Sequence, residues 1–296
     1  MSIRVAFPLV ALASSLIAVA QPLREAETQS PADWQRKHDM AIKYRNLGDF
    51  YAALKKEAAS KQPAPLPDWT GLWTGTGGGR PNRPGPGGVS PKWTPVGMAE
   101  VKHGEEMNAK GLVYDENLSN CGPAGFPRWM VEPFLREFIV TPGEDWLISE
   151  QVNEIRRIYT DGRDHPPEAD RYPLDEGDSI GFWDGQKLVI HTNQLRSASM
   201  GRNAPTQSEQ METVEIWEKV DASTILADVW LFDPRLYTET WYFQRRYSRV
   251  PNRDKRLRIN YWNCSENPNN AVVKTEDGDT VRKGYTFIEK SKENGK

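Results

Sequence analysis

The second half of the chain alternates between apolar and polar residues with a period of two. From Pro133 onward, short runs recur between turn signals, which is typical of β-strands. Short links without helices predict sequential antiparallel strands in a barrel or a sandwich. They exclude a parallel α/β fold, whose crossovers need a dozen or more residues. The runs cover residues 136–142, 145–151, 153–160, 179–183, 186–193, 211–220, 223–232, 236–248, 257–264 and 284–290.

A helical pattern precedes the strands. Apolar residues recur at three- and four-residue steps from Met40 to Leu54, and Ser30-Pro31 is a good helix start. The proline-rich stretch 63–67 cannot continue a helix. We therefore expect one amphipathic helix over 31–60 on the main body, and a short helix near 95–109.

The first twenty residues have the layout of a secretory signal peptide. Arg4 precedes an apolar run from Val5 to Val19, and Ala18-Val19-Ala20 is an A-x-A cleavage site. The sequence thus predicts a periplasmic or secreted protein with no membrane span after cleavage. The net charge of −3 becomes −4 when Arg4 is removed, and nothing in it indicates a nucleic-acid partner.

Cys121 and Cys264 are the two cysteines. In an oxidising compartment the natural expectation is a single Cys121–Cys264 disulfide, and two buried free thiols are the alternative. Two cysteines without a second pair do not form a zinc site, so no metal is predicted.

Aromatic residues are abundant, with eleven Trp, ten Tyr and nine Phe. One face of 236–247 interleaves rings with charges, from Tyr237 and Glu239 to Arg245 and Tyr247. This pattern fits a cavity wall for a ring-bearing ligand. It fits equally well a two-sided sheet whose outer face the N-terminal helix covers.

The segment 153–173 concentrates candidate chemistry. Asp161-Gly162 is a turn, and Arg156 lies on a strand whose alternation directs one of Arg156 and Arg157 inward. A buried guanidinium needs a carboxylate, and Glu137 is the expected partner. Two interpretations remain open, a structural Glu137–Arg156 ion pair and a ligand-binding arginine beside a general acid/base glutamate. Tyr159, on the face of Arg157, joins the catalytic candidates.

Histidines supply the second set of candidates. His165 ends the turn loop at the expected barrel rim and is either a proton shuttle or a loop anchor. His191 is on a strand and can face either way. The glycine-rich loop 74–92 has no phosphate-loop motif, and its prolines and arginines indicate a mobile surface loop.

Six blocks occur in an order that resembles a large family of exported proteobacterial and acidobacterial proteins. They are DWTGLW (68–73), CGPAGFPR (121–128), PFLREFIVTPG (133–143), EIRRIYTDGRDHP (154–166), DSIGFWDGQKLVIHTN (178–193) and DPRLYTETW (233–241). The resemblance implies an antiparallel lipocalin-like β-barrel of about 8–10 strands with an N-terminal amphipathic helix. The domain limits would be a helix and proline-rich linker over 21–67 and a barrel over 68–290. His191 departs from the family pattern, in which an acidic residue is usual.

Some sphingomonad relatives connect the family with cofactor-free lyases that open phenylcoumaran-type lignin dimers, losing CO₂ or formaldehyde to leave a stilbene. The resemblance thus implies an exported, cofactor-independent carbon–carbon lyase acting on a small aromatic molecule. Its catalytic residues would be Glu137, Arg156, Tyr159, His165 and His191, and its substrate-binding residues Arg128, Trp129, Trp183 and Trp241. A binding protein without turnover and a structural envelope module are the alternatives, and the sequence leaves the oligomeric state open.

Overall fold

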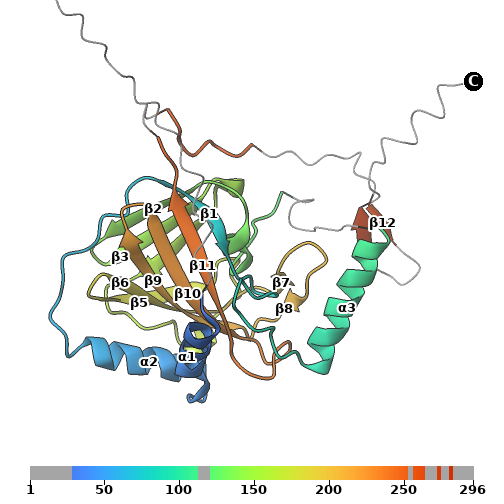
Figure 1. The fold of residues 1–296 in the computed structure, drawn as a ribbon, viewed down its shortest axis with the longest axis horizontal. Coiled ribbons are helices and arrows are strands. Elements are labelled where there is room, and N and C mark those ends of the chain that lie inside the picture. Colours follow the sequence, from blue (N-terminus) through green and yellow to red (C-terminus); the bar gives the residue numbers. More distant parts are fainter. Residues whose placement is uncertain (1–28, 113–120, 253–255, 264–271, 275–279, 283–296) are drawn as a thin grey trace, which may run out of the picture.

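The protein is a closed nine-stranded β-barrel with helices on its outer surface (Figure 1). The computed structural model describes residues 29–112, 121–252, 256–263, 272–274 and 280–282. The barrel order is β1-β11-β10-β9-β6-β5-β4-β3-β2, and β2 closes on β1. The bounds are β1 Leu72–Gly78, β2 Arg136–Thr141, β3 Glu144–Ser149, β4 Ile155–Tyr159, β5 Asp178–Asp184, β6 Lys187–Asn193, β9 Glu212–Asp221, β10 Thr224–Phe232 and β11 Trp241–Arg249.

The prediction of an all-β barrel is confirmed, with two differences in the strands. β4 and β5 pair in parallel, through Tyr159 and Ile180, because a long loop with the 3-10 turn Glu168–Asp170 joins them instead of a hairpin. Residues 257–263 form no strand, and 284–290 lie outside the described residues. Two small ribbons complete the sheets, β7 (Ala198–Ser199) with β8 (Thr206–Gln207) and β12 (Val272–Lys274) with β13 (Thr280–Arg282).

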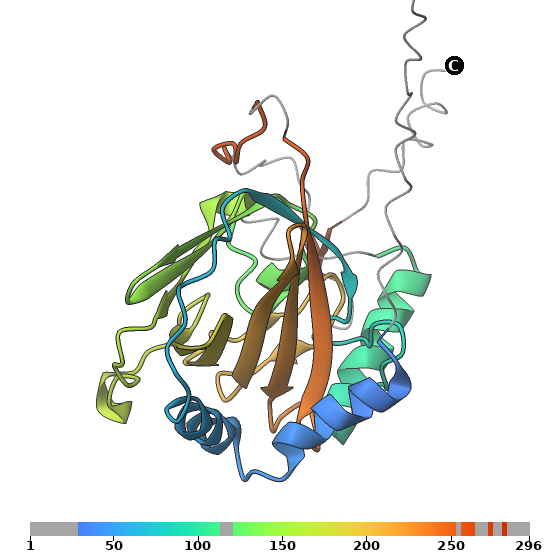
Figure 2. The same ribbon diagram turned by 60° about the vertical axis from the view of Figure 1, so that its left-hand side comes forward.

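The single helix expected over 31–60 is two helices, α1 (Pro31–Ile42) and α2 (Leu47–Ala58). The chain breaks between them because Asn46 adopts an extended backbone and its side chain accepts a hydrogen bond from Asp49 N at 2.7 Å, which caps α2. Ser30 caps α1 in the same way. α2 packs on β5, β6 and β9, and α1 packs on β11, so both cover the outer face of the barrel (Figure 2).

The barrel interior is filled by the chain's own rings. Trp217 stacks on Tyr247 with ring centroids 5.2 Å apart, and Phe138 meets both edge-on. Residues 124–131 close one mouth of the barrel with Phe126 and Trp129, both 0% exposed, and the Tyr247 hydroxyl donates to Met130 O. At this end the interior is a packed core.

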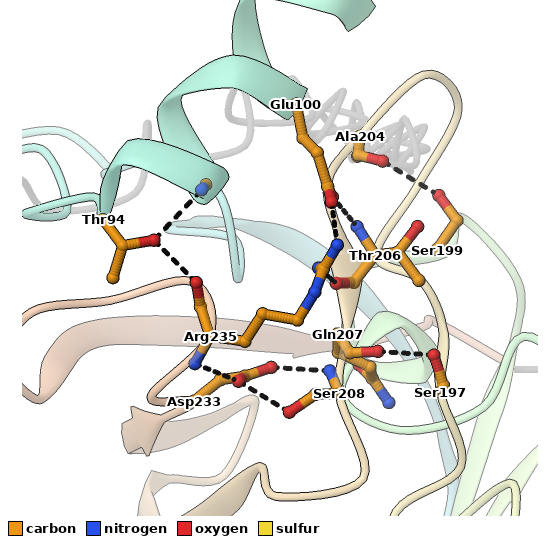
Figure 3. A network of polar contacts seen from close by, with 11 residues as sticks. Thr94, Glu100, Ser197, Ser199, Ala204, Thr206, Gln207, Ser208, Asp233 and Arg235 are labelled. Carbon is orange, nitrogen blue, oxygen red and sulfur yellow. Dashed lines mark hydrogen bonds and ion pairs between the residues drawn. The ribbon is translucent and has the colours of Figure 1, made fainter.

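A polar network joins α3 (Pro95–Ala109) to the β7–β8 ribbon and the β10–β11 connection (Figure 3). Glu100 forms an ion pair with Arg235 and accepts from Thr206 N. Asp233, 0% exposed, accepts from Ser208 N and Oγ and from Arg235 N, so one buried carboxylate ties two loops together.

Two predictions concern residues that the structure does not describe. The proposed signal peptide, 1–20, lies outside the described residues, as does Cys264, so the disulfide with Cys121 stays a prediction. Within the described parts of the chain, no helix has the length and apolar character to cross a membrane.

Candidate functional site

Arg156 lies inside the barrel, where Glu215 is its partner. The guanidinium donates to both carboxylate oxygens of Glu215, Nη1 at 3.0 Å and Nη2 at 2.6 Å, and both residues are 0% exposed. Arg156 also donates to Ser179 Oγ and Thr192 Oγ1. The Phe126 ring lies 3.7 Å from the guanidinium carbon. With its nitrogens used by the protein and its face covered by a ring, Arg156 is built as a structural cation.

The expected Glu137–Arg156 pair is therefore wrong. β2 alternates with Arg136 and Phe138 buried and Glu137 between them, so Glu137 faces the outside of the barrel. There it lines an outer groove with Gly71 and Arg249. Arg156 instead reaches across β5 and β6 to β9, and the interpretation as a structural ion pair holds with a different acid.

The two candidate histidines meet on the outer face of the same strands. His165 Nε2 and His191 Nδ1 are 2.8 Å apart, and a short hydrogen bond joins His165 Nδ1 to Asp178 Oδ1. His191 Nε2 then points toward Glu212 Oε2 at 3.7 Å. These four residues form one chain of titratable groups, Asp178–His165–His191–Glu212, which we call the histidine relay.

The relay is held between the barrel and α2. The Tyr51 ring stacks on His191 with centroids 5.5 Å apart, and a Cβ at Gly48 would lie 3.9 Å from His191 Cε1. The side chains of His165 and His191 are 9% and 7% exposed, whereas Glu212 is 37% exposed. The histidine relay thus runs from a buried pair of imidazoles to the carboxylate of Glu212, which is open to solvent.

The donors and acceptors of the relay indicate where the protons lie when both imidazoles are neutral. If His165 Nδ1–H donates to Asp178, its Nε2 must accept from His191 Nδ1–H. His191 Nε2 is then a lone pair, buried and without a hydrogen-bond partner among the described residues. A proton that binds to His191 Nε2 would face the Glu212 carboxylate. When that proton leaves, both imidazoles of the relay are neutral again.

The electrostatics of His191 and Glu212 agree with this picture. Burial lowers the pKa of His191, against the opposing pull of Glu212, and the charge of His165 lowers it further. The pKa of Glu212 is lowered, chiefly by its polar contact with His191. Neutral imidazole beside an ionised carboxylate is the arrangement of a general base.

A second acidic group, which sequence reasoning missed, lies near the closed mouth. Glu154 is 6% exposed and accepts from Gly125 N at 2.8 Å. Burial raises the pKa of both Glu154 and Glu176, and the Glu154 charge adds to the shift at Glu176. Glu154 Oε2 and both carboxyl oxygens of Glu176 are buried and have no hydrogen-bond partner among the described residues. One proton shared between the two carboxyls would join two of these three oxygens and remove the repulsion between two like charges.

Asp145, at the far end of the barrel, was also missed. It is 0% exposed, accepts from Thr141 N at 3.1 Å, and lies beside the Trp183 indole, and burial raises its pKa to about 7. Trp183 also meets Trp69 edge-on at 5.4 Å. The sequence did hold a signal for Asp145, because the period-two alternation of β3 directs Asp145 inward with Leu147.

The other predicted residues do not join the relay. Tyr159 faces outward under the Arg163 guanidinium, 4.0 Å from the ring centroid. Arg128 is ion-paired with Glu132 at 2.5 Å. Trp129 and Trp241, 0% and 2% exposed, are core rings. Over the described ranges, no group of three or more His, Cys, Asp or Glu is arranged to hold a metal ion.

Comparison with known proteins adds little to this geometry. No protein-family model matches the sequence, and no curated protein does. Among solved structures, the crystal structure of a mutant of the fluorescent protein UnaG is similar, with 14% sequence identity and a TM-score of 0.29. The match covers 62% of this chain and 96% of that one. A likeness this distant carries no argument, and the barrel rests on the strand pairing of this chain.

Proposed function

We propose that this protein is a general acid–base enzyme in which the histidine relay moves the proton. The single observation that supports the proposal is the hydrogen-bonded His165–His191 pair between Asp178 and Glu212. Asp178 would orient His165, His165 would orient His191, and His191 Nε2 would be the atom that takes and returns the proton.

The reaction class comes from the family resemblance, which implies a cofactor-independent carbon–carbon lyase acting on a lignin-derived aromatic dimer. Removal of the phenol proton opens the ring ether, whose oxygen ends as a new phenol. Loss of formaldehyde from a primary alcohol, or of CO₂ from an acid, then restores the ring and leaves a stilbene. Each step moves protons and rearranges bonds without net oxidation, and one base that accepts and returns a proton suffices.

The proposal differs from a barrel-interior mechanism in where the substrate meets the protein. Phe126 covers Arg156, and Arg156 is neutralised by Glu215. The proposal therefore assigns substrate contact to the outer rim, at the exposed Glu212 end of the relay, and gives Arg156 a supporting role in holding β4, β5, β6 and β9 together.

The test is turnover of phenylcoumaran-type acids and alcohols by the purified protein, followed by stilbene absorbance. His165→Gln and His191→Gln should each lower the rate at least about 100-fold, the usual contribution of a positioned acid–base group. His103→Gln, on the exposed surface of α3, is the matched control and should keep the wild-type rate. Absence of any product, together with ring-dependent quenching of tryptophan fluorescence, would favour a binding protein without turnover instead.

A further inference from the structure

The segment 124–131, which closes one mouth of the barrel, is held at its start by two different parts of the chain. Gly125 N donates to Glu154 Oε1, and Phe126 N donates to Asp175 O, each at 2.8 Å. A Cβ at Gly125, where φ is 69°, would lie 3.0 Å from Asp175 O. The start of the segment therefore lies directly on both members of the buried carboxyl pair described above.

The two acids are fixed to the barrel and not to the segment that covers them. Glu154 immediately precedes β4, and its backbone carbonyl accepts from Ser149 N at 2.9 Å. Glu176 immediately precedes Gly177, where a Cβ would lie 2.6 Å from Thr192 Cγ2 on β6. Because a side chain does not fit at this position, the loop lies close against β6. The barrel thus sets the positions of both carboxyl groups.

The carboxyl pair needs a proton. A polar contact joins the two carboxyl groups, and an ionised carboxylate can only accept hydrogen bonds. Three oxygens of Glu154 and Glu176 are buried without a hydrogen-bond partner among the described residues. A proton on Glu176 gives the pair a donor. If both acids were ionised, two like charges would face each other without water.

The nearby arginines do not replace this proton. Arg156 lowers the pKa of Glu176 by its charge, but its nitrogens donate to Glu215 and to two hydroxyl groups. Arg136 lowers the pKa of Glu154 in the same way, but its Nη atoms donate to four backbone carbonyls. Burial has the largest influence on both acids, and it raises the pKa of Glu176 well above its usual 4.5.

The other ionisable groups near the pair have partners or stay neutral. Asp175, whose charge raises the pKa of the adjacent acid, is ion-paired with Arg196 at 3.1 Å. Glu132 is ion-paired with Arg128. Burial raises the pKa of Tyr247, which therefore stays uncharged. None of these groups supplies a donor to the orphaned carboxyl oxygens.

The proton makes closure of the barrel mouth depend on pH. Glu176 holds a proton more tightly when covered than in water, so the closed state is favoured most below the usual pKa of 4.5. As the pH rises from there toward the raised pKa of Glu176, the balance moves toward a hydrated, open state by about tenfold per pH unit. Water can reach the pair when the start of the segment 124–131 lifts, because that part of the chain covers it.

We propose that Glu154 and Glu176 form a proton-dependent latch, in which a shared proton keeps the segment 124–131 closed over the barrel mouth and its loss releases the segment. Release uncovers the Phe126 ring and, 3.7 Å from it, the guanidinium of Arg156. The latch therefore controls access to the barrel interior. It is independent of the proposed lyase reaction, whose relay lies on the outer face.

The test is hydrogen–deuterium exchange of the full chain from pH 5 to pH 9, read by mass spectrometry and corrected for the intrinsic pH dependence of amide exchange. In the wild type, protection of peptides from 124–131 should fall at least about tenfold over this range. Glu176→Gln keeps a donor but cannot ionise, so its protection should change less than about twofold. Glu168→Gln, exposed on the same loop, is the matched control and should follow the wild type.

Further comparisons separate the latch from other titrations. Asp145 and the histidines are present in both the wild type and Glu176→Gln, so the difference between these proteins excludes their effect. Glu154→Gln removes the other charge and should also abolish the pH dependence, which gives a second test if Glu176→Gln does not fold. Peptides from β9 and β10 should stay protected throughout.

Three results would overturn the proposal. The first is a wild-type segment 124–131 that keeps its protection up to pH 9. The second is a wild type and a folded Glu176→Gln or Glu154→Gln with the same pH dependence, or a Glu168→Gln control that loses it. The third is loss of protection in β9 and β10 together with 124–131, because the titration would then unfold the whole barrel.

Discussion

The two faces of β5, β6 and β9 carry polar side chains that differ in how completely they are hydrogen-bonded. Asp178, His191 and Glu212 face outward, and their chain neighbours Ser179, Thr192 and Thr213 face the interior around Arg156 and Glu215. Strand alternation places each pair of neighbours on opposite faces. The same three strands therefore surround a sealed ion pair, which Arg156 of β4 completes, on one side, and carry three of the four relay residues on the other.

On the inner face, the Arg156–Glu215 pair has all its hydrogen bonds within the protein. Glu215 accepts from Arg156 and from Trp217 Nε1 at 2.8 Å, and both charges are fully buried. The outer group is incomplete, because His191 Nε2 lacks a hydrogen-bond partner among the described residues and Glu212 is partly open to solvent. A saturated network holds structure, whereas a network with one spare site can exchange a proton.

The largest effect should come from breaking the inner pair. Glu215→Gln leaves the Arg156 charge buried without a counter-charge, and we expect a loss of about 3–5 kcal/mol in the free energy of unfolding, measured by urea denaturation. The double variant Arg156→Met/Glu215→Leu removes both charges and should recover most of that loss. A Glu215→Gln variant within about 1 kcal/mol of wild type would show that the pair is not a structural centre.

The next effect concerns the other inner acid, Asp145, and depends on pH. Its folded pKa of about 7 lies above its usual value of 3.8, so its contribution to stability is full below the usual pKa and is lost as the pH rises through 7. Asp145→Asn imitates the neutral acid and should exceed wild type by about 2–4 kcal/mol at pH 8, but by little at pH 4. Urea denaturation at both pH values checks this, with the exposed Asp170→Asn as the control that should show no such gain.

A smaller effect should follow from loosening the cover of the relay. Asn46→Ala removes the cap of α2, and Ser30→Ala removes the matched cap of α1. Each should cost about 1 kcal/mol in thermal unfolding. Only the α2 variant should also slow turnover, since α2 carries Tyr51 and Gly48 against His191. Equal turnover in the two variants would remove α2 from the proposed site.

The sequence predicts the barrel fold better than it predicts the side-chain contacts of the candidate site. Period-two runs and turn residues are local signals, and they predict the barrel correctly. The break at Asn46 was missed because the apolar stripe continues through it, although Asn is a strong cap. Glu176 lies in a loop, and Glu154 lies at the start of the predicted strand run 153–160. Both were missed as buried acids because nothing in their own sequence shows that the distant segment 124–131 will cover them.

The partner of Arg156 shows why site contacts are harder to predict. Alternation indicates that an arginine turns inward, but the acid it meets depends on which strands are neighbours after the barrel closes. Glu215 is 59 residues away in sequence and three strands away in the sheet order. His165 and His191 were both candidates, but their contact depends on the path of the loop 160–177, which no periodicity encodes.

The smallest effect on stability, and the one that separates the two faces most directly, should come from the histidines. His191→Gln keeps a polar group next to His165, and we expect unfolding at pH 7.5 to change by less than about 1 kcal/mol, measured by thermal denaturation. The folded pKa of His191 lies below its usual 6.5, so wild type loses stability as the pH falls from 6.5 toward that folded value. The variant lacks this loss, and the gap between the two proteins should therefore shrink or reverse by pH 5. A large loss at pH 7.5 would instead make His191 a structural residue like Glu215, and the outer face would then be as closed to proton chemistry as the inner one.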